Sequence, residues 1–181
     1  GKMPVSLVPC DMRVATEAIL ENYHTRAVAK GITFHYSAVS SPIVLADAIL
    51  LPQILDNLIS NALKYSPSGK SIFVRIKENN LDDEKKIRLE VQDEGPGLSD
   101  VDKDKLFQKF ARLSARPTAG EHSTGLGLSI VKKMVEAMNG TVWCESVLGE
   151  GSVFFVDLPA ASVASNHHRN STYHYQDSVH A

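Results

Sequence analysis

Residues 56–66 form a helix-like stretch with an unusual polar face, composed of Asn57, Asn61, Lys64 and Tyr65. These side chains fall together when the sequence is plotted at about 100° per residue, and leucines, isoleucines and alanines fall opposite them. Asn is a poor helix former because its side chain competes for backbone hydrogen bonds. Two asparagines one turn apart therefore indicate carboxamide oxygens placed for a hard cation, with a solvated helix face as the alternative.

A second pattern, Asp93-Glu-Gly95-Pro-Gly97, follows directly on an alternating strand. A plain turn accounts for it, since glycines readily supply positive φ. The functional interpretation is a carboxylate held at the end of a strand. It would accept a hydrogen bond from a flat donor such as an exocyclic amine, and the glycines would let the backbone lie against a ring.

A third pattern, Thr124-Gly125-Leu126-Gly127, opens a helix. Free amide groups and the helix dipole make such a terminus suited to an anion, and glycines let phosphate oxygens approach. A flexible glycine-rich loop is the alternative. The pattern lacks the Lys-Ser/Thr of a P-loop and follows a loop instead of a strand, so it predicts neither a Walker nor a Rossmann site.

A loop without periodicity, residues 112–124, precedes this helix and is long enough to be a lid or a binding loop. Phe107 and Phe110 are expected to be core residues at its base. Lys109, Arg112 and Arg116 are ordinarily solvated charges, but in a lid over a phosphate one of them could reach the γ-phosphoryl oxygens.

No histidine stands out as a phosphate acceptor. His24 has no acidic neighbour and His35 lies in an alternating strand, so both are expected to be structural. The four histidines after residue 160 are irregularly spaced, which favours solvated residues over a metal site.

Composition sets the broad class. The chain has 181 residues, of which 43% are hydrophobic, with a formal net charge of −2 and a pI near 6.4. This balance predicts a soluble domain without nucleic-acid binding or direct membrane contact, expected in the cytoplasm as a monomer. The two cysteines, Cys10 and Cys144, are compatible with one disulfide or with two free thiols. Free thiols in a reducing compartment are the simpler expectation.

Periodicity and stop signals predict the elements. Helices are expected over residues 11–30, 47–65, 99–110 and 124–138, capped at their starts by Asp11, Asp47 and Ser99. Strands are expected over residues 5–8, 32–36, 42–46, 71–77, 87–91, 141–146 and 152–158, with 78–85 as the turn of a hairpin. In the first helix the expected apolar positions are Val14, Ala18, Leu20, Ala27 and Val28.

This uneven alternation predicts an α+β fold, a two-layer sandwich with helices on one face of a mixed, mostly antiparallel sheet. Residues 1–159 are expected to form one domain. Residues 160–181 change to Ala, Ser, Asn, His and Tyr without pattern, which predicts a disordered tail.

The order of the motifs resembles one family: an Asn-bearing helix, D-x-G-x-G, F-x-K-F, T-G-L-G-L and G-x-G-S-x-F. It is similar to the catalytic ATP-binding domain of sensor histidine kinases, within the superfamily that includes DNA gyrase and MutL. The likeness covers residues 5–159 and implies the Bergerat-type ATP-binding fold.

By this resemblance, Asn61 is expected to be the Mg²⁺ ligand, with Asn57 supporting the metal shell. Lys64 would contact phosphate, Tyr65 would lie against the nucleotide, and Asp93 would accept from the adenine amine.

The other motifs carry over in the same way. Gly95 and Gly97 would shape the adenine pocket, and Phe107 and Phe110 match the phenylalanine box. Arg112 matches a lid arginine near the γ-phosphate. The phosphates would be cradled by the segment Thr124, Gly125, Leu126 and Gly127.

Three departures matter. Ser123 stands where relatives often have the first glycine of G-T-G-L-G, which bears on how freely the lid moves. Asn57 stands where the ATP-hydrolysing relatives have a Glu that acts as a base on water, and an amide favours phosphoryl transfer over hydrolysis. Nothing in the chain resembles the dimerisation domain with its acceptor histidine, so that domain is expected elsewhere in a longer protein.

The resemblance implies the Mg-ATP-binding half of a histidine autokinase, which transfers the γ-phosphoryl to a histidine on the dimerisation domain and acts upstream of a response regulator. A serine kinase of the anti-sigma-factor type and a non-catalytic nucleotide-binding regulatory module are the alternatives.

Overall fold

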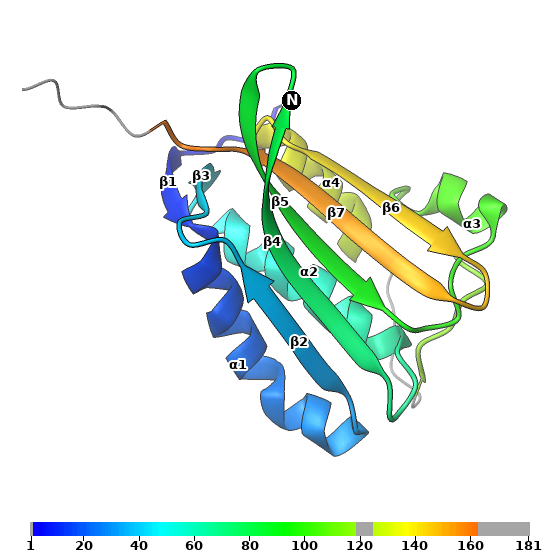
Figure 1. Cartoon of the computed structure of the whole chain (residues 1–181). Helices are drawn as coiled ribbons and strands as arrows, with labels where there is room; N and C mark the ends of the chain where they lie inside the picture. Colours follow the sequence, from blue (N-terminus) through cyan, green and yellow to red (C-terminus); the bar gives the residue numbers. More distant parts are fainter. Residues whose placement is uncertain (1, 119–124, 163–181) are drawn as a thin grey trace, which may run out of the picture.

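A five-stranded sheet is the frame of the molecule, and the computed structural model describes residues 2–118 and 125–162 of it (Figure 1). The strand order is β2-β4-β5-β7-β6. Only β2 and β4 run parallel, and the other neighbours are antiparallel. The strands are β2 (Thr33–Ala38), β4 (Ser71–Leu81), β5 (Glu84–Asp93), β7 (Gly151–Pro159) and β6 (Thr141–Val147). A separate antiparallel pair is formed by β1 (Leu7–Asp11) and β3 (Ile43–Asp47).

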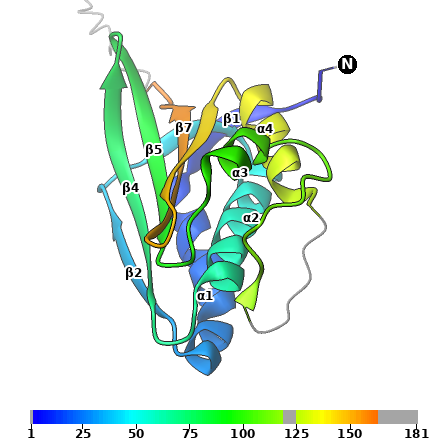
Figure 2. The same ribbon diagram turned by 90° about the vertical axis from the view of Figure 1, so that its right-hand side faces the viewer.

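The long helices pack on one face of this sheet, as Figure 2 shows edge-on. They are α1 (Met12–Lys30), α2 (Leu50–Tyr65) and α4 (Gly127–Ala137). The short helix α3 (Asp100–Lys105) lies beside the end of β6, where Lys103 Nζ donates to the Ser146 carbonyl at 3.3 Å. The predicted two-layer α+β sandwich with a mixed, mostly antiparallel sheet is thus confirmed.

Helix α2 is central to the core. Its apolar residues repeat at helical spacing and are buried against the sheet, namely Leu51, Ile54, Leu55, Leu58, Ile59, Ala62 and Leu63. The predicted cap differs: the N-cap residue of α2 is Ile49, which makes no side-chain cap hydrogen bond, and Asp47 closes the preceding turn, where its Oδ1 accepts from the amides of Ile49 at 2.9 Å and Leu50 at 3.1 Å. The regular helix begins after this turn and ends at Tyr65, as predicted. Its apolar face is therefore fixed inward and its asparagine face outward.

Helix α1 has the predicted ends but a different buried face. Asp11 caps its start and Gly31, at φ 71°, ends it. The apolar positions predicted at Val14 and Val28 are wrong, since these side chains are 60% and 62% exposed. The position predicted at Ala27 is confirmed, and the rest of the buried stripe is Met12, Thr16 and Ile19. An outer helix contacts its neighbours along a narrow line, so only part of its apolar sequence is buried.

The hairpin β4–β5 is longer than predicted. The pairing continues to Leu81 and Glu84, so that most of the expected turn over residues 78–85 is strand. Only Asp82 and Asp83 form the turn, at φ 52° and 63°. Two consecutive positive φ values are typical of the tight hairpin turn whose twist matches that of the strands.

The last described residues remain attached to the sheet. The amide of Ala160 donates to the Lys85 carbonyl and that of Ala161 to the Ile43 carbonyl, both at 3.0 Å. The contacts with the strands therefore continue for two residues past 159, the predicted limit of the domain. The rest of the predicted tail, from residue 163, lies outside the described residues.

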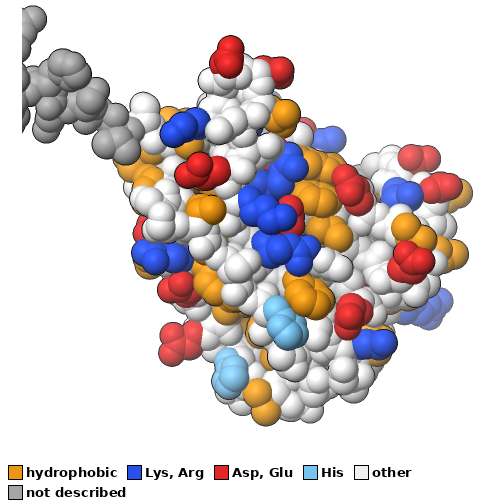
Figure 3. All heavy atoms as spheres, in the orientation of Figure 1, with side chains coloured by type: hydrophobic (Ala, Val, Ile, Leu, Met, Phe, Trp, Pro, Cys, Tyr) orange, Lys and Arg blue, Asp and Glu red, His pale blue; other side chains and the backbone are white. Residues whose placement is uncertain are grey.

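The face of the sheet opposite the helices carries cations above buried carboxylates (Figure 3). Arg75 and Lys77 contact Glu90 at 2.7 and 3.1 Å, and Arg88 contacts Asp157 at 2.8 Å. The Arg88 guanidinium also lies 4.8 Å from the Trp143 ring centroid. These cross-strand contacts tie four strands together without helical cover.

Two further predictions concern reactive side chains. Cys10 and Cys144 are both free thiols. His35 contacts Ser71 Oγ at 3.1 Å and stacks on Phe73, consistent with the structural role predicted for it.

Across the described parts of the chain, every helix is too short or too polar to span a bilayer.

Candidate functional site

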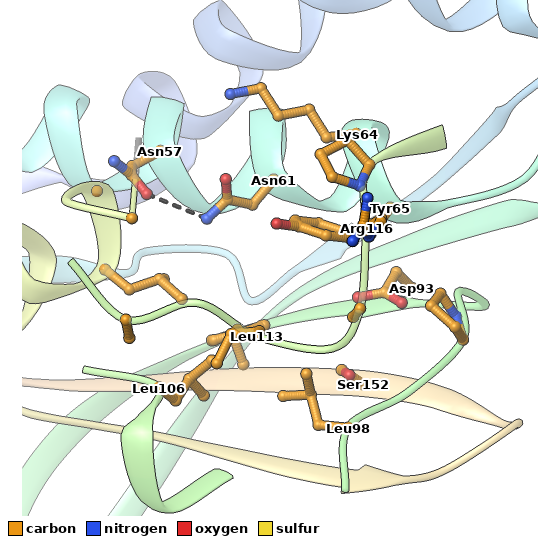
Figure 4. Close-up of a pocket in the computed structure, with 18 of the residues that line it drawn as sticks. Asn57, Asn61, Lys64, Tyr65, Asp93, Leu98, Leu106, Leu113, Arg116 and Ser152 are labelled. Atoms are coloured by element: carbon orange, nitrogen blue, oxygen red, sulfur yellow. Dashed lines mark hydrogen bonds between the residues drawn. The ribbon is translucent and has the colours of Figure 1, made fainter. Parts of the chain in front are cut away.

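A cavity of about 800 Å³ lies between the polar face of α2, the ends of β5 and β7, and the segment that follows α3 (Figure 4). Most of the residues that sequence patterns singled out line it. Such a volume is within the range of pockets that hold small molecules and cofactors.

The two asparagines of α2 lie at one end of the cavity. Asn61 Nδ2 donates to Asn57 Oδ1 at 3.3 Å, the hydrogen bond drawn in Figure 4. This bond orients both carboxamides and leaves the Asn61 Oδ1 for another partner. The Lys64 side chain extends along α2 toward the Asn57 end and away from Asp93. Tyr65 also lines the cavity.

Asp93 lies at the opposite end, as the last residue of β5. It is 6% exposed, and its Oδ1 accepts from the Gly95 amide at 2.9 Å. Burial disfavours the charged form and raises the pKa of this carboxyl to about 6, although hydrogen bonds from Gly95 and Ser152 act against the rise. A buried carboxyl with a strongly shifted pKa in a cavity is typical of a binding or catalytic position.

Two glycines permit close backbone approaches at this site. Gly97 has φ 68°, and a Cβ there would lie 2.1 Å from the Val147 carbonyl oxygen. At Gly127 a Cβ would lie 2.6 Å from Asn57 Nδ2. A Cβ at Gly97 would collide with backbone, whereas a Cβ at Gly127 would displace the end of the Asn57 side chain.

Helix α4 points its N-terminus at the asparagine end of the cavity, where Gly125 and Gly127 line it. Within the residues that the structure describes, no side-chain hydrogen bond caps this helix at Leu126, whose carbonyl accepts from the Ile130 amide at 3.1 Å. The first amides of an uncapped helix are available to an anion. Thr124, predicted for the same role, lies outside the described residues.

The phenylalanine pair departs from the prediction. Helix α3 ends at Lys105 and does not reach Phe107 or Phe110. Phe107 packs against the core, but Phe110 is 71% exposed and has φ 57°, so its predicted core role is wrong. Its amide donates to the Gly125 carbonyl at 3.1 Å, which joins the segment after α3 to the start of α4. Phe110 and the exposed Arg112 and Arg116 line the cavity.

Sequence patterns missed several cavity residues. Ser152 is 7% exposed and pairs with Asp93 across β5 and β7. It lies in the G-x-G-S-x-F stretch, so a signal for it was present. Phe154, the last residue of the same stretch, had that signal too, whereas the apolar wall residues Leu98, Leu106 and Leu113 had none because their types are those of ordinary core residues.

The donor set suits Mg²⁺ in company with phosphates. The described residues contain no group of three or more His, Cys, Asp or Glu side chains able to hold a metal by themselves. Mg²⁺ is commonly held by one or two protein oxygens together with waters and substrate phosphates. The oriented Asn57–Asn61 pair beside the uncapped end of α4 fits that arrangement.

A protein-family model described as "Histidine kinase-, DNA gyrase B-, and HSP90-like ATPase" matches residues 46–162. The sensor histidine kinase WalK of Bacillus subtilis (strain 168) is 41% identical over 109 residues, which are 60% of this chain and 18% of WalK. The chain thus spans about a fifth of the length of its curated WalK relatives.

Solved structures of histidine kinases have a fold similar to that of this chain. The mycobacterial sensor histidine kinase MprB superposes with a TM-score of 0.73 at 26% identity, over 84% of this chain and 97% of that one. Full-length ShkA in complex with AMPPNP gives a TM-score of 0.75 at 30% identity, over 91% of this chain and 33% of that one.

Proposed function

Because this chain belongs to the family of histidine kinase-, DNA gyrase B- and HSP90-like ATPases, we propose that it is the Mg-ATP-binding catalytic domain of a sensor histidine kinase. One observation carries this proposal. A nucleotide-sized cavity has a buried carboxyl, Asp93, at one end and the Asn57–Asn61 pair with the uncapped end of α4 at the other.

The two ends suit the two ends of ATP. At the Asp93 end, a carboxylate accepts from the adenine amine while apolar walls receive the base. The close approaches at Gly95 and Gly97 shape this pocket, and Tyr65 covers the nucleotide from α2. The AMPPNP bound to ShkA, which has a similar fold, supports an adenine nucleotide as the ligand.

At the other end, the amides of Gly125, Leu126 and Gly127 receive phosphate oxygens with the help of the helix dipole. Lys64 and Arg112 supply positive charge, and Phe110 holds the segment that carries Arg112. Thr124 is proposed as part of the same phosphate cradle.

Asn61 Oδ1 is the proposed Mg²⁺ ligand, and Asn57 orients it through the hydrogen bond between the two carboxamides. Held by these residues, the cation would neutralise negative charge on the phosphates. The protein's own contribution is to position the γ-phosphoryl group and to surround it with donors.

Asn57 also bears on the reaction class. A carboxamide does not accept a proton from water, so this position offers no general base for hydrolysis. The arrangement favours transfer to a nucleophile that arrives from another domain. We propose a histidine of the dimerisation domain of the full-length protein as that nucleophile, with a response regulator acting downstream.

The limits of the domain belong to the same proposal. Residues 1–159 with the attached Ala160 and Ala161 would form one catalytic unit, monomeric when isolated. Mg-ATP, and not nucleic acid or a membrane, would be its ligand. The unit would act on the cytoplasmic side.

A transfer experiment tests the proposed reaction. The isolated chain mixed with γ-³²P-ATP should remain unlabelled, because neither His24 nor His35 lines the cavity and an unpositioned imidazole loses most of the advantage of proximity. Adding the dimerisation domain of the full-length protein should yield an acid-labile phosphohistidine on that domain. Acid-stable labelling of a partner serine would point to the serine-kinase alternative, and stoichiometric self-labelling would contradict the proposed division of roles.

A further inference from the structure

Three polar side chains form a row across the sheet at the Asp93 end of the cavity. Ser152 of β7 lies opposite Asp93 of β5 on one side and opposite Ser146 of β6 on the other. Directly opposed residues have Cβ atoms about 4.5–5.5 Å apart, so the Ser152 hydroxyl has an acceptor within reach on each side. Asp93 and Ser152 both line the cavity, and Figure 4 shows them at the same end of it.

The hydrogen bonds of Ser146 determine where the Ser152 proton lies. Ser146 Oγ lies 2.7 Å from the Gly151 carbonyl oxygen, which can only accept, so Ser146 uses its single proton there. Ser146 Oγ also lies 2.8 Å from Ser152 Oγ. Because the Ser146 proton is already used, the proton in this second contact is that of Ser152. The Ser152 hydroxyl therefore donates to Ser146 and not to Asp93.

The remaining lone pair of Ser146 is filled by a third element. The Leu98 amide donates to Ser146 Oγ at 2.8 Å. A serine hydroxyl has one proton and two lone pairs, so one carbonyl, one hydroxyl and one amide use all the hydrogen-bonding capacity of Ser146. This set of partners leaves Ser146 one hydroxyl orientation, and that orientation fixes the Ser152 hydroxyl in turn.

Asp93 would otherwise be the stronger acceptor for the Ser152 proton, because hydrogen bonds to an ionised group are about twice as strong as neutral ones. Among the described residues, its donors are the backbone amides of Gly95 and Ser152. Cys144 of β6 also lies beside Ser152, but burial raises the pKa of its thiol to about 12, so it stays neutral and is a weak acceptor. Ser146 is therefore the group that withholds the Ser152 proton from Asp93.

We propose that Ser146 is a positioning residue for base recognition: it holds the Ser152 hydroxyl away from Asp93, so that the carboxylate keeps an oxygen for the amine of the nucleotide. The inference rests on the proposed function, since it concerns how Asp93 recognises adenine. Ser146 is not among the residues that line the cavity, so it acts through Ser152.

The first test needs no nucleotide and follows the Asp93 carboxyl of the whole chain by ¹³C NMR as pH is varied. In Ser146→Ala the Ser152 hydroxyl loses its acceptor and turns to Asp93. A donor to the charged form favours that form, so the pKa of Asp93 should fall below its wild-type value. Ser146→Ala/Ser152→Ala has no hydroxyl to supply, and its Asp93 pKa should return toward wild type. The other titratable groups at or beside the cavity are the same in all three proteins, namely Lys64, Tyr65, Glu94, Arg112, Arg116 and Cys144.

The second test is calorimetric titration of the same proteins with Mg-ATP. Ser146→Ala should bind at least about tenfold more weakly, since a hydrogen bond to a charged group now competes with the nucleotide. Removing the competitor in Ser146→Ala/Ser152→Ala should regain most of that loss, although it deletes a second polar group. A role confined to packing predicts the opposite order for these two variants.

Three further variants make the result specific. Ser146→Thr retains the hydroxyl and should recover wild-type affinity and the wild-type pKa of Asp93. Ser146→Cys fills the same space with a weak acceptor and should behave as Ser146→Ala does. Ser37→Ala, the same change at an exposed position of β2, is the matched control and should alter neither quantity.

The outcomes separate the two proposals. A wild-type chain that binds no adenine nucleotide would overturn the proposed function, and the role of Ser146 in base recognition with it. If wild type binds, an unchanged Asp93 pKa in both Ser146→Ala and Ser146→Cys would overturn the inference alone. A double variant that binds Mg-ATP no better than Ser146→Ala would do the same, because Ser146 would then only support the end of the sheet.

Discussion

At the scale of single residues, Asp93 shows a conflict between stability and binding. Its carboxyl is buried at the end of β5 with one backbone amide at 2.9 Å, and burial raises its pKa to about 6. At neutral pH the folded protein therefore holds a charge in a poorly solvated place. A flat amine donor in the cavity would stabilise that charge, which is why the residue suits adenine recognition.

Replacing Asp93 with Asn should separate these two effects. The pKa of Asp93 in the folded protein lies above the ordinary value of 3.8, so the folded state binds the proton more tightly than the unfolded state. The free-energy cost of holding a charged Asp93 carboxylate in the folded protein is absent below about pH 4, grows between pH 4 and 6, and is complete above pH 6. At about 1.4 kcal/mol per pKa unit, the wild-type penalty is up to about 3 kcal/mol at pH 7.5.

Urea unfolding at pH 4 and pH 7.5 measures the prediction. Asp93→Asn should gain stability relative to wild type as pH rises between these values, while its ATP binding is lost. The informative quantity is the difference in the free energy of unfolding between the two proteins, because all other groups titrate equally in both. A difference that stays constant with pH would show that Asp93 is not the penalised group.

At the scale of elements, the open face of the sheet depends on cations that neutralise buried carboxylates. Asp157 on β7 is 4% exposed and is held by Arg88 on β5 at 2.8 Å through two nitrogens. Glu90 is held by both Arg75 and Lys77. Removing Arg88 therefore takes away the cation that holds Asp157, whereas removing Lys77 leaves Glu90 with Arg75.

Arg88→Met should destabilise the fold by about 2–4 kcal/mol, because a buried charge that loses its partner remains costly. Methionine retains much of the apolar stem, so the loss reports mainly on charge. Lys77→Met on the same face is the matched control and should cost less than about 1 kcal/mol, since Lys77 is exposed and Arg75 still pairs Glu90. Equal urea midpoints for the two variants would contradict this account of the sheet.

Elements with strong local signals were predictable from the sequence. Helix α2 has a broad apolar stripe, and α1 has Asp11 and Gly31 at its ends. The hairpin tip was misjudged because the residues after Lys77 are polar and their strand pairing comes from a two-residue turn of aspartates, which are uncommon at positive φ. The buried face of α1 depends on which neighbours it meets, and that information is not local.

At the scale of the whole molecule, the site is assembled from segments that are distant in sequence. The order of the motifs identified α2, the end of β5 and the start of α4, since each motif has its own local pattern. It did not identify Ser152 as the partner of Asp93, nor the exposure of Phe110, nor the contacts of Ser146. These depend on strand register and on contacts between residues that are distant in sequence, for which residue types alone carry little signal.

The central claim is that this cavity binds adenine nucleotide through the buried carboxylate Asp93. Calorimetric titration of the chain with Mg-ATP and Mg-GTP tests it most directly. Guanine offers a carbonyl where adenine offers an amine, and a site built around a hydrogen bond strongly rejects an analogue that cannot make it. The account predicts that ATP binds at least about a hundredfold more tightly than GTP. Equal affinity for the two nucleotides, or no binding of either, would contradict it.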